Sequence, residues 1–148
     1  MTIDEERAEV CRVAATYVGT PYHHHGTIKG VGVDCATILI LVYSEAGLIE
    51  PYDPGEYSEQ WFLHRQDDLY LQHLLKFAVE VETPKQGDVV LFKIARQFAH
   101  GGIVTAWPMM IHAYKPDRLV LPGDGTQGEF SDVKASPRRF FTLKRWAD

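Results

Sequence analysis

The pattern of hydrophobic and polar positions predicts helices in the first half of the chain and strands in the second. Apolar residues recur at helical spacing over Asp4–Val18, and Gly19-Thr20-Pro21 ends that segment because proline cannot extend a helix. A second helix is predicted from Asp34 or Cys35 to about Ala46. Its nearly continuous apolar sequence indicates burial on most sides.

The rest of the chain changes from helical to strand patterns. Pro51–Val81 is predicted to form short helical pieces, whereas the residues after Pro84 and Gly87 form short runs rich in β-branched and aromatic side chains. The predicted strands are Asp88–Lys93, Gly102–Trp107, Met110–Tyr114, Arg118–Leu121 and Phe140–Trp146. Helices followed by strands is the order of an α+β fold with segregated layers.

Composition and charge exclude several classes of protein. The 148 residues are 45% hydrophobic and 24% charged, without repeats or linkers, so we expect one globular domain over residues 1–148. No apolar run approaches the ~20 residues of a membrane helix. The net charge of −5 argues against a nucleic-acid surface that binds phosphates. Met1–Arg7 lacks the features of a secretory signal, so we expect synthesis in the cytoplasm without one.

The two cysteines lie in different settings. Cys35 opens the predicted second helix, where the helix dipole and free N–H groups favour a thiolate and can stabilise an oxyanion. Cys35 is therefore a candidate nucleophile, with a buried inert cysteine as the alternative. Cys11 lies inside the first helix, where we expect a core side chain, and we expect no disulfide between the two.

A nucleophilic thiol needs a base, and two histidines are candidates. His100 begins a strand just before Gly101-Gly102, and His112 lies in the apolar strand Met110–Tyr114. Their separation suits a hairpin that turns around Trp107-Pro108-Met109, which would make the two histidines neighbours. One would then act as the base and the other would hold its tautomer. Taken alone, each is more often a hydrogen-bonded structural histidine.

Three consecutive histidines, His23, His24 and His25, lie in the loop before Cys35. Adjacent side chains point in different directions, and no second pair at metal-ligand spacing accompanies them, so a metal site is disfavoured. We expect the run to line a substrate groove, and we expect no metal or other cofactor.

Four motifs in order resemble the NlpC-type cell-wall cysteine peptidases, from about residue 8 to the C-terminus. The motifs are Tyr17-Val-Gly-Thr-Pro-Tyr22 with Val33-Asp34-Cys35, then Gln86-Gly87-Asp88-Val-Val-Leu-Phe92, His100-Gly-Gly-Ile-Val104 and Met110-Ile-His112-Ala. The resemblance implies a papain-like α+β fold. In that fold N-terminal helices pack on a C-terminal antiparallel β-sheet that is partly barrel-like.

The resemblance also implies roles for individual residues. Cys35 corresponds to the nucleophile, His100 to the general base and acid, and His112 to the residue that orients it. Tyr22 corresponds to a tyrosine that assists oxyanion stabilisation, the alternative being an aromatic packed on the second helix. Asp34 is the acid before the cysteine, for which we favour helix capping. Candidate substrate-binding residues are His23, His24, His25 and Asp34.

Two departures from the family pattern concern the pocket. Ala36-Thr37 follows the nucleophile where the family usually has Ser-Gly, and Gly101 replaces a larger residue. With the compact length and the missing signal, the alanine resembles phage and prophage members associated with tail assembly. Such a protein would have other phage tail proteins as partners and would reach the cell wall in a virion or by lysis.

The function implied is that of a cysteine peptidase, a hydrolase that cleaves amide bonds in the stem peptides of bacterial peptidoglycan through a thioester. The family usually cuts between D-glutamate and a diamino acid, as a γ-D-glutamyl-diamino acid endopeptidase. An amidase or acyltransferase with the same triad is the first alternative. The second is a non-catalytic tail assembly module. Neither nucleic acid nor a membrane is an expected partner.

Overall fold

The computed structural model describes residues 1–51, 53, 55, 69–94, 97–134 and 136–147. Helix α1 (Ile3–Thr16) begins at a capping box, in which the Thr2 hydroxyl accepts from the Glu5 N–H and the Glu5 carboxylate accepts from the Thr2 N–H. Gly19 follows the helix with a φ of 91°, a conformation that favours glycine. The first predicted helix is therefore confirmed, with its end about two residues earlier.

The second predicted helix is also confirmed, but it starts at Thr37, so Cys35 lies in the turn just before it rather than at its first position. Helix α2 (Thr37–Glu45) ends at Ala46, and Gly47 follows in the left-handed conformation with a φ of 79°. Six of its nine residues are buried, as the apolar run predicts. None of the described helices is long and apolar enough to cross a membrane.

The middle of the chain differs from the prediction at its end. Helix α3 (Leu69–Leu74) lies in the region predicted to be helical, but strand β3 (Ala78–Val81) takes its last residues. Residues 56–68 of the region predicted to be helical lie outside the described residues. β3 forms because it pairs with a strand more than 55 residues away, a partner that local periodicity does not reveal.

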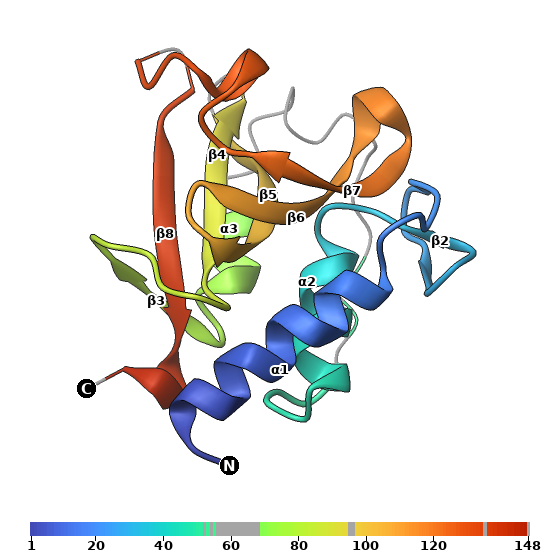
Figure 1. The fold of residues 1–148 in the computed structure, drawn as a ribbon. Coiled ribbons are helices and arrows are strands. Elements are labelled where there is room, and N and C mark those ends of the chain that lie inside the picture. The colour runs from blue at the N-terminus through green and yellow to red at the C-terminus, as the bar shows by residue number, and fades with distance from the viewer. Residues whose placement is uncertain (52, 54, 56–68, 95–96, 135, 148) are drawn as a thin grey trace.

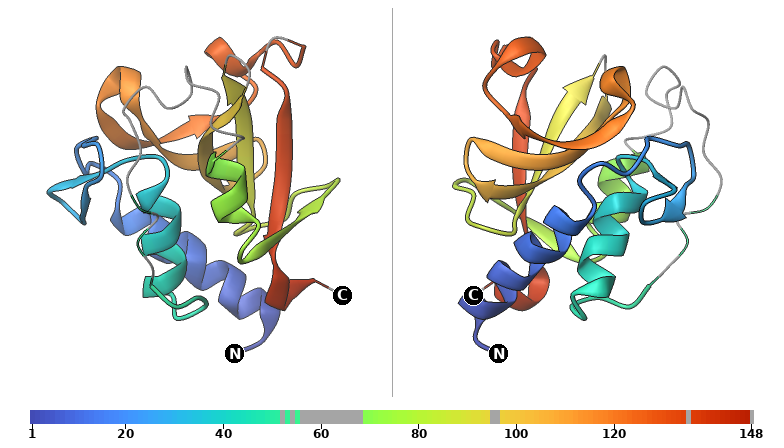
Figure 2. Two further views of the ribbon diagram at one scale, coloured as in Figure 1. Left: turned by 180° about the vertical axis from the view of Figure 1, so that it is seen from behind. Right: turned by 45° about the vertical axis from the view of Figure 1, so that its right-hand side comes forward.

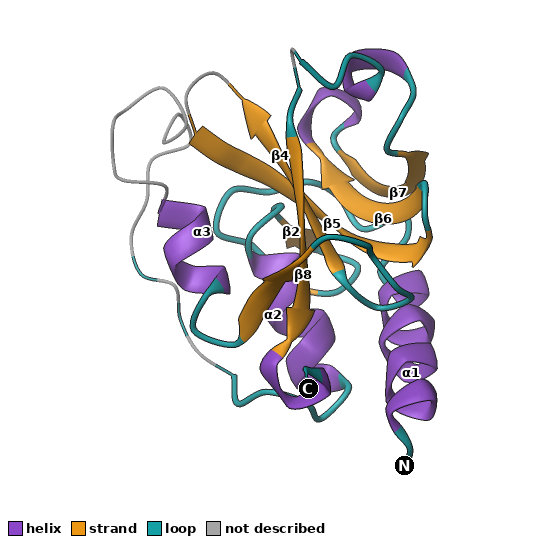
Figure 3. Cartoon of the chain, turned by 90° about the vertical axis from the view of Figure 1, so that its left-hand side faces the viewer, coloured by secondary structure: helices purple, strands orange, loops and turns teal. Residues whose placement is uncertain are grey.

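The main sheet has six antiparallel strands in the order β3-β8-β4-β5-β6-β7 (Figure 3). A strand forms at each of the five predicted runs: β4 (Val89–Ile94), β5 (Gln97–Ala106), β6 (Met109–Tyr114), β7 (Leu119–Asp124) and β8 (Arg138–Leu143). Their bounds differ from the prediction, because β5 begins before His100, at Gln97, and Lys144–Trp146 at the end of the last run is a 3-10 helix. A separate hairpin joins β1 (Thr27–Ile28) to β2 (Gly32–Val33). The α+β prediction holds.

The expectation of a partly barrel-like sheet is wrong, because the sheet is open. Strands β3 and β7 are its two edges and do not pair with each other. The edge at β7 is covered instead by the segment before the β1–β2 hairpin: Pro21 forms a bridge with Leu119, and the Tyr22 N–H donates to the Arg118 carbonyl at 2.9 Å.

Helices α1 and α2 pack against the same side of the sheet (Figure 1), and the two ends of the chain lie close together (Figure 2). Alternate residues of β4 face two hydrophobic clusters. Val89 and Leu91 face the larger cluster beneath the helices, which includes Cys35. Val90 and Phe92 face a smaller cluster on the other side, with Phe130.

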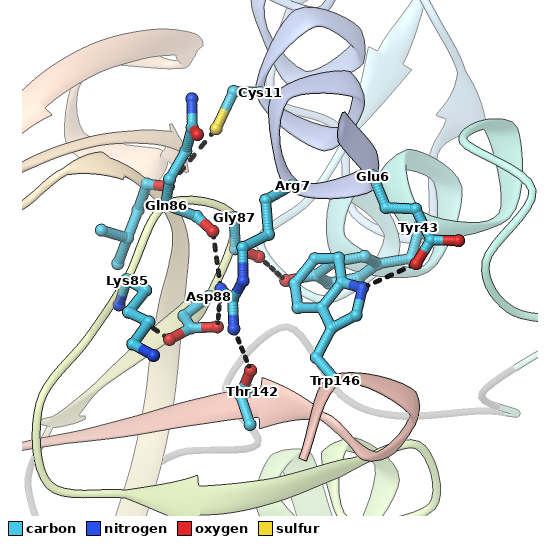
Figure 4. Close-up of polar contacts among 11 residues, drawn as sticks. Glu6, Arg7, Cys11, Tyr43, Lys85, Gln86, Gly87, Asp88, Thr142 and Trp146 are labelled. Carbon is cyan, nitrogen blue, oxygen red and sulfur yellow. Dashed lines mark hydrogen bonds and ion pairs between the residues drawn. The ribbon is translucent and has the colours of Figure 1, made fainter. Parts of the chain in front are cut away.

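A buried polar cluster ties α1 to the sheet (Figure 4), and we call it the Arg7 cluster. The Arg7 guanidinium donates to the Asp88 carboxylate at 2.8 Å, to the Gln86 carbonyl at 2.7 Å and to the Thr142 hydroxyl at 3.0 Å. The Tyr43 hydroxyl donates to the Gly87 carbonyl beside it, at 2.5 Å. These bonds fix the start of β4, which carries the family-like Gly-Asp turn.

Glu6 and Cys11 complete the attachment of α1. Glu6 accepts from the Trp146 indole at 2.9 Å and from Arg145 at 2.7 Å, so the last turn of the chain is held on the first helix. Cys11 is half-buried, and its thiol lies 3.5 Å from the Val104 carbonyl, at the contact between α1 and β5. No disulfide joins it to Cys35 in the described structure.

Candidate active site

Asp34 holds Cys35 at the start of α2. One Asp34 oxygen accepts from the backbone N–H groups of Ala36 and Thr37, each at 2.9 Å, and the Thr37 hydroxyl accepts from the Asp34 N–H at 2.9 Å. This is the capping role favoured by the sequence. The Asp34 carboxylate is buried and committed to the backbone around it, which favours that role over direct substrate binding.

The same carboxylate holds the histidine loop. The second Asp34 oxygen accepts from the His25 N–H at 2.9 Å and lies 4.0 Å from the His24 ring nitrogen Nδ1. Glycine allows the loop to pack closely, because a Cβ on Gly32 would lie 2.6 Å from the Cβ of His23. The loop before the nucleophile is therefore fixed to the same helix start as the nucleophile.

A pocket of about 460 Å³ is lined by residues of this loop and of α2. Its described lining residues are His25, Thr27, Thr37, Ile40, Leu41, Pro51 and Asp53. His25 lines this pocket, whereas His23 and His24 are not among its described lining, and substrate binding by the three histidines stays a prediction. No group of three or more His, Cys, Asp or Glu side chains suited to hold a metal occurs within the described residues.

Tyr22 and Cys35 form the first pair of candidate catalytic residues. The Tyr22 hydroxyl donates to the Cys35 sulfur at a distance of 4.0 Å. Burial raises the pKa of Tyr22 far above its ordinary value, and the neighbouring Cys35 and Asp34 add to that effect. Tyr22 therefore keeps its proton and acts as a hydrogen-bond donor.

The protonation state of Cys35 differs from the sequence expectation. Burial, and after it the charge of Asp34, raises the pKa of the Cys35 thiol well above its ordinary value. The hydrogen bond from Tyr22, the backbone and the charge of Lys115 lower it by less. The expected preference for a thiolate is wrong for the resting protein, because burial outweighs the position at the helix start.

His100 and His112 form the second pair. Strands β5 and β6 make the predicted hairpin, and His100 Nε2 lies 2.8 Å from His112 Nδ1. The prediction that the two histidines are neighbours is confirmed. Burial lowers the pKa of His100 to about 3, with the nearby His112 as a second cause, and burial lowers the pKa of His112 to about 4. Both imidazoles are neutral near pH 7.

The hydrogen bond between the histidines determines which nitrogen can act as a base. It occupies Nε2 of His100, so Nδ1 is the ring nitrogen left to accept a proton from a thiol. In a catalytic triad the base is oriented through one nitrogen and reacts through the other. The observed bond has that form.

Three aromatic rings surround the histidines. Phe92 faces His100 across the β4–β5 pair with ring centroids 6.1 Å apart, and Tyr114 and Phe130 contact both imidazoles. Tyr114 lies two residues after His112 on one face of β6, so strand alternation alone could have identified it. Phe130 lies in the segment between β7 and β8, which carries no periodic signal.

The structure brings together the members of each pair but, in the part of the chain that it describes, shows no contact between the two pairs: His100 stacks on Phe92 and Phe130 of the smaller cluster, whereas Cys35 belongs to the larger cluster beneath the helices. Within the described residues no hydrogen bond joins the Cys35 sulfur to His100 or His112. Lys115, whose charge reaches Cys35, directly follows Tyr114, which contacts both histidine rings. Proton transfer between Cys35 and His100 stays a prediction.

An open antiparallel sheet with helices on one face, a cysteine at a helix start and a histidine pair on the central hairpin define a papain-like α+β protein. A sequence model of the NlpC/P60 family matches residues 19–127. The chain belongs to the NlpC/P60 family. A search of curated proteins finds no match.

Solved structures share the fold at low sequence identity. An N-acetylmuramoyl-L-alanine amidase from Bacteroides uniformis is 14% identical with a TM-score of 0.66, over 95% of this chain and 99% of that one. The NlpC/p60 domain of the peptidoglycan hydrolase SagA is 21% identical, with a TM-score of 0.57, over 90% and 96%. NlpC1 from Trichomonas vaginalis is 16% identical, with a TM-score of 0.64, and 95% of this chain covers 44% of it.

Proposed function

We propose that this protein is a cysteine hydrolase that cleaves amide bonds in the peptide stems of peptidoglycan. The observation that carries the proposal is the 2.8 Å contact between His100 Nε2 and His112 Nδ1, which leaves Nδ1 of His100 for the thiol. Cys35, next to the capped start of α2, supplies the nucleophile, and the Tyr22 hydroxyl beside its sulfur supplies a hydrogen-bond donor. Two structures of the same fold are described as a peptidoglycan hydrolase and a muramoyl amidase.

The reaction starts from a neutral thiol and a neutral imidazole. As the Cys35 sulfur attacks the amide carbon, Nδ1 of His100 accepts the thiol proton, and the tetrahedral oxyanion forms. The C–N bond then breaks, and His100 gives its proton to the leaving amine. A thioester remains on Cys35. Water attacks it with His100 as the base, which releases the carboxylic acid and restores the thiol.

The oxyanion needs donors that are already in place. The Cys35 N–H, just before α2, and the Tyr22 hydroxyl, 4.0 Å from the Cys35 sulfur, are the donors proposed for this role. Removing one such donor typically costs about 2.7–4 kcal/mol of barrier stabilisation. The raised pKa of Tyr22 keeps its proton available for this role.

Two scissile bonds are candidates. The family-like motifs favour the bond between D-glutamate and a diamino acid. The full-length similarity in fold to the Bacteroides amidase favours, as a second candidate, the bond between the muramoyl group and L-alanine. Association with a phage tail, and with tail proteins as partners, is a further part of the proposal, and it rests on Ala36 in the sequence.

One assay tests activity and bond choice together. The protein is incubated with purified muropeptides, and the products are identified by mass. Cys35→Ala should reduce turnover by at least about 10⁴-fold because it removes the nucleophile. Cys11→Ala, the matched control, should retain wild-type activity because Cys11 lies at the contact between α1 and β5.

The products distinguish the alternatives. A free diamino-acid amine identifies the endopeptidase, and a free L-alanine amine identifies the amidase. If folded wild-type protein leaves every muropeptide intact, the hydrolase proposal is wrong and a non-catalytic module is supported. If Cys35→Ala cleaves as fast as the wild type, Cys35 is not the nucleophile.

A further inference from the structure

We propose that Phe130 and Tyr114 are positioning residues for the histidine pair, acting as an aromatic wall that fixes the planes of both imidazoles. The inference rests on the proposed function, since a fixed imidazole plane matters for proton transfer. Its geometry is independent of which amide bond is cut. Neither residue belongs to the motifs that carry the family resemblance.

The ring planes of the wall match those of the histidines. Phe130 lies parallel to His100, at 5.8 Å and 10°, and edge-on to His112, at 6.1 Å and 63°. Tyr114 is nearly parallel to His112, at 4.9 Å and 28°, and edge-on to His100, at 5.9 Å and 62°. The imidazoles themselves meet at 67°. Each wall ring therefore restrains one imidazole by its face and the other by its edge.

Phe130 is held by contacts of its own. It is 6% exposed, and its ring centroid lies 4.2 Å from that of Phe92. Its carbonyl accepts from the Arg138 guanidinium at 2.7 Å, and its N–H donates to the Gln127 carbonyl at 3.0 Å. A residue outside the β5–β6 hairpin is thus anchored against the hairpin, as a positioning role requires.

The wall has two physical consequences. Rotation of His100 about its ring torsion would break the bond to His112, and the parallel Phe130 ring blocks that rotation. The aromatic surfaces also exclude water, which favours the neutral imidazole. Both consequences keep His100 ready to accept a proton through Nδ1.

Few charged groups face the histidines from the surrounding elements. Asp117, after β6, raises the pKa of His112 against the larger effect of burial. Burial raises the pKa of the Tyr114 hydroxyl, and Glu129, beside Phe130, adds to that effect. The Arg138 guanidinium of β8 lies over the Phe92 ring at 5.8 Å. The nearest titratable neighbour of His100 is His112. Removing the Phe130 ring therefore changes the solvation of His100 more than its charged surroundings.

The test replaces Phe130 by leucine and uses Phe140→Leu as the matched control. Phe140 packs in the same cluster, against Trp107 at 4.8 Å, and does not contact either histidine within the described residues. The His100 titration midpoint is measured by NMR of the imidazole carbons, and kcat and KM are measured across pH. Phe130→Leu should raise the midpoint towards its ordinary value and lower kcat about tenfold, with KM within about twofold.

Two more variants make the result decisive. In Tyr114→Phe, which keeps the ring, both histidines should titrate as in the wild type. Tyr114→Leu should raise the titration midpoint of His112. That variant tests the proposal if Phe130→Leu does not fold. Unchanged midpoints in the leucine variants, or an equal change in Phe140→Leu, would overturn the proposal. The titration needs no substrate, so it distinguishes this failure from failure of the hydrolase proposal.

Discussion

The Arg7 cluster and the histidine pair are both buried polar groups, but they are built differently. The buried Arg7 guanidinium donates hydrogen bonds to three acceptors, and the Asp88 carboxylate at 2.8 Å neutralises its charge. His100 and His112 are neutral, share one hydrogen bond and are otherwise surrounded by aromatic rings. In the Arg7 cluster the charges are paired with each other, whereas in the histidine pair Nδ1 of His100 is left to accept a proton.

This difference separates stability from chemistry within one small domain. A buried charge must be paired, so losing one partner of the Arg7 cluster is costly for folding. A buried neutral imidazole costs less to keep and can still accept a proton. Substitutions in the two regions should therefore affect different measurements.

The largest effect is expected for His100→Gln. Glutamine can keep a hydrogen bond to Nδ1 of His112 but cannot act as a base, so kcat on muropeptides should fall by about 10²–10⁴-fold. The free energy of unfolding should change by less than about 1.5 kcal/mol, because a polar partner remains. Steady-state kinetics and urea unfolding measure the two quantities. An active His100→Gln enzyme would rule out His100 as the base.

The next effect is expected for Arg7→Met, which should reverse that pattern. Asp88 is 1% exposed, so the substitution leaves a buried carboxylate without its cation and should cost about 3–5 kcal/mol of unfolding free energy. The kcat of the folded protein, measured across pH, should match the wild type. Urea unfolding measures the loss.

Arg12→Met is the matched control for Arg7→Met. Arg12 pairs with Glu9 on the solvent side of α1, with the Arg12 side chain 65% exposed, so its loss should leave the free energy of unfolding close to the wild-type value. Equal costs for the two arginine substitutions would contradict the distinction between a buried, bonded cluster and a solvated pair.

Protonation provides the third effect. The pKa values of His100 and His112 are lowered from 6.5 to about 3 and about 4, so below pH 6.5 the unfolded chain binds protons that the folded chain does not. The stability that the two neutral histidines contribute is complete above pH 6.5 and is lost as the pH falls from 6.5 towards about 4 for His112 and about 3 for His100. Each histidine should add a slope of up to about 1.4 kcal/mol per pH unit between about pH 4 and 6.5.

Unfolding free energies measured from about pH 4.5 to about 7.5 test this slope. His100→Gln should reduce it, whereas His23→Gln, which removes an exposed histidine, should keep the wild-type slope. A wild-type stability that is flat across this window would show that the folded histidines bind protons as readily as the unfolded ones.

Much of the fold and of both pairs could be predicted from the sequence because local signals carry them. Gly19, Gly47 and the β-branched runs set the element ends and strands, and the spacing of His100 and His112 around the turn at Trp107 made them neighbours. These features depend on residues within about one hairpin of each other, where period and turn chemistry are informative.

What could not be predicted depends on contacts across the fold. Strand β3 exists through pairing with β8, and Phe130 reaches His100 from a segment without a pattern. The Cys35 thiol was expected to ionise because of its helix position. Its actual burial and the orientation of Asp34 decide the pKa in the other direction, and both are three-dimensional properties.

The smallest effect compares two buried tyrosine hydroxyls. Tyr22→Phe removes the donor 4.0 Å from the Cys35 sulfur and should lower kcat about tenfold, less than the loss of a closely placed oxyanion donor. Tyr43→Phe leaves the buried Gly87 carbonyl without its donor and should cost about 1–3 kcal/mol of unfolding free energy.

Each tyrosine variant serves as the control for the other. Tyr22→Phe should retain wild-type stability, and Tyr43→Phe should retain wild-type kcat wherever it is folded. If Tyr22→Phe loses stability and keeps its kcat, Tyr22 is a packing residue on α2, as its contact with the cluster beneath the helices also allows. The oxyanion would then depend on the Cys35 N–H and a donor other than Tyr22.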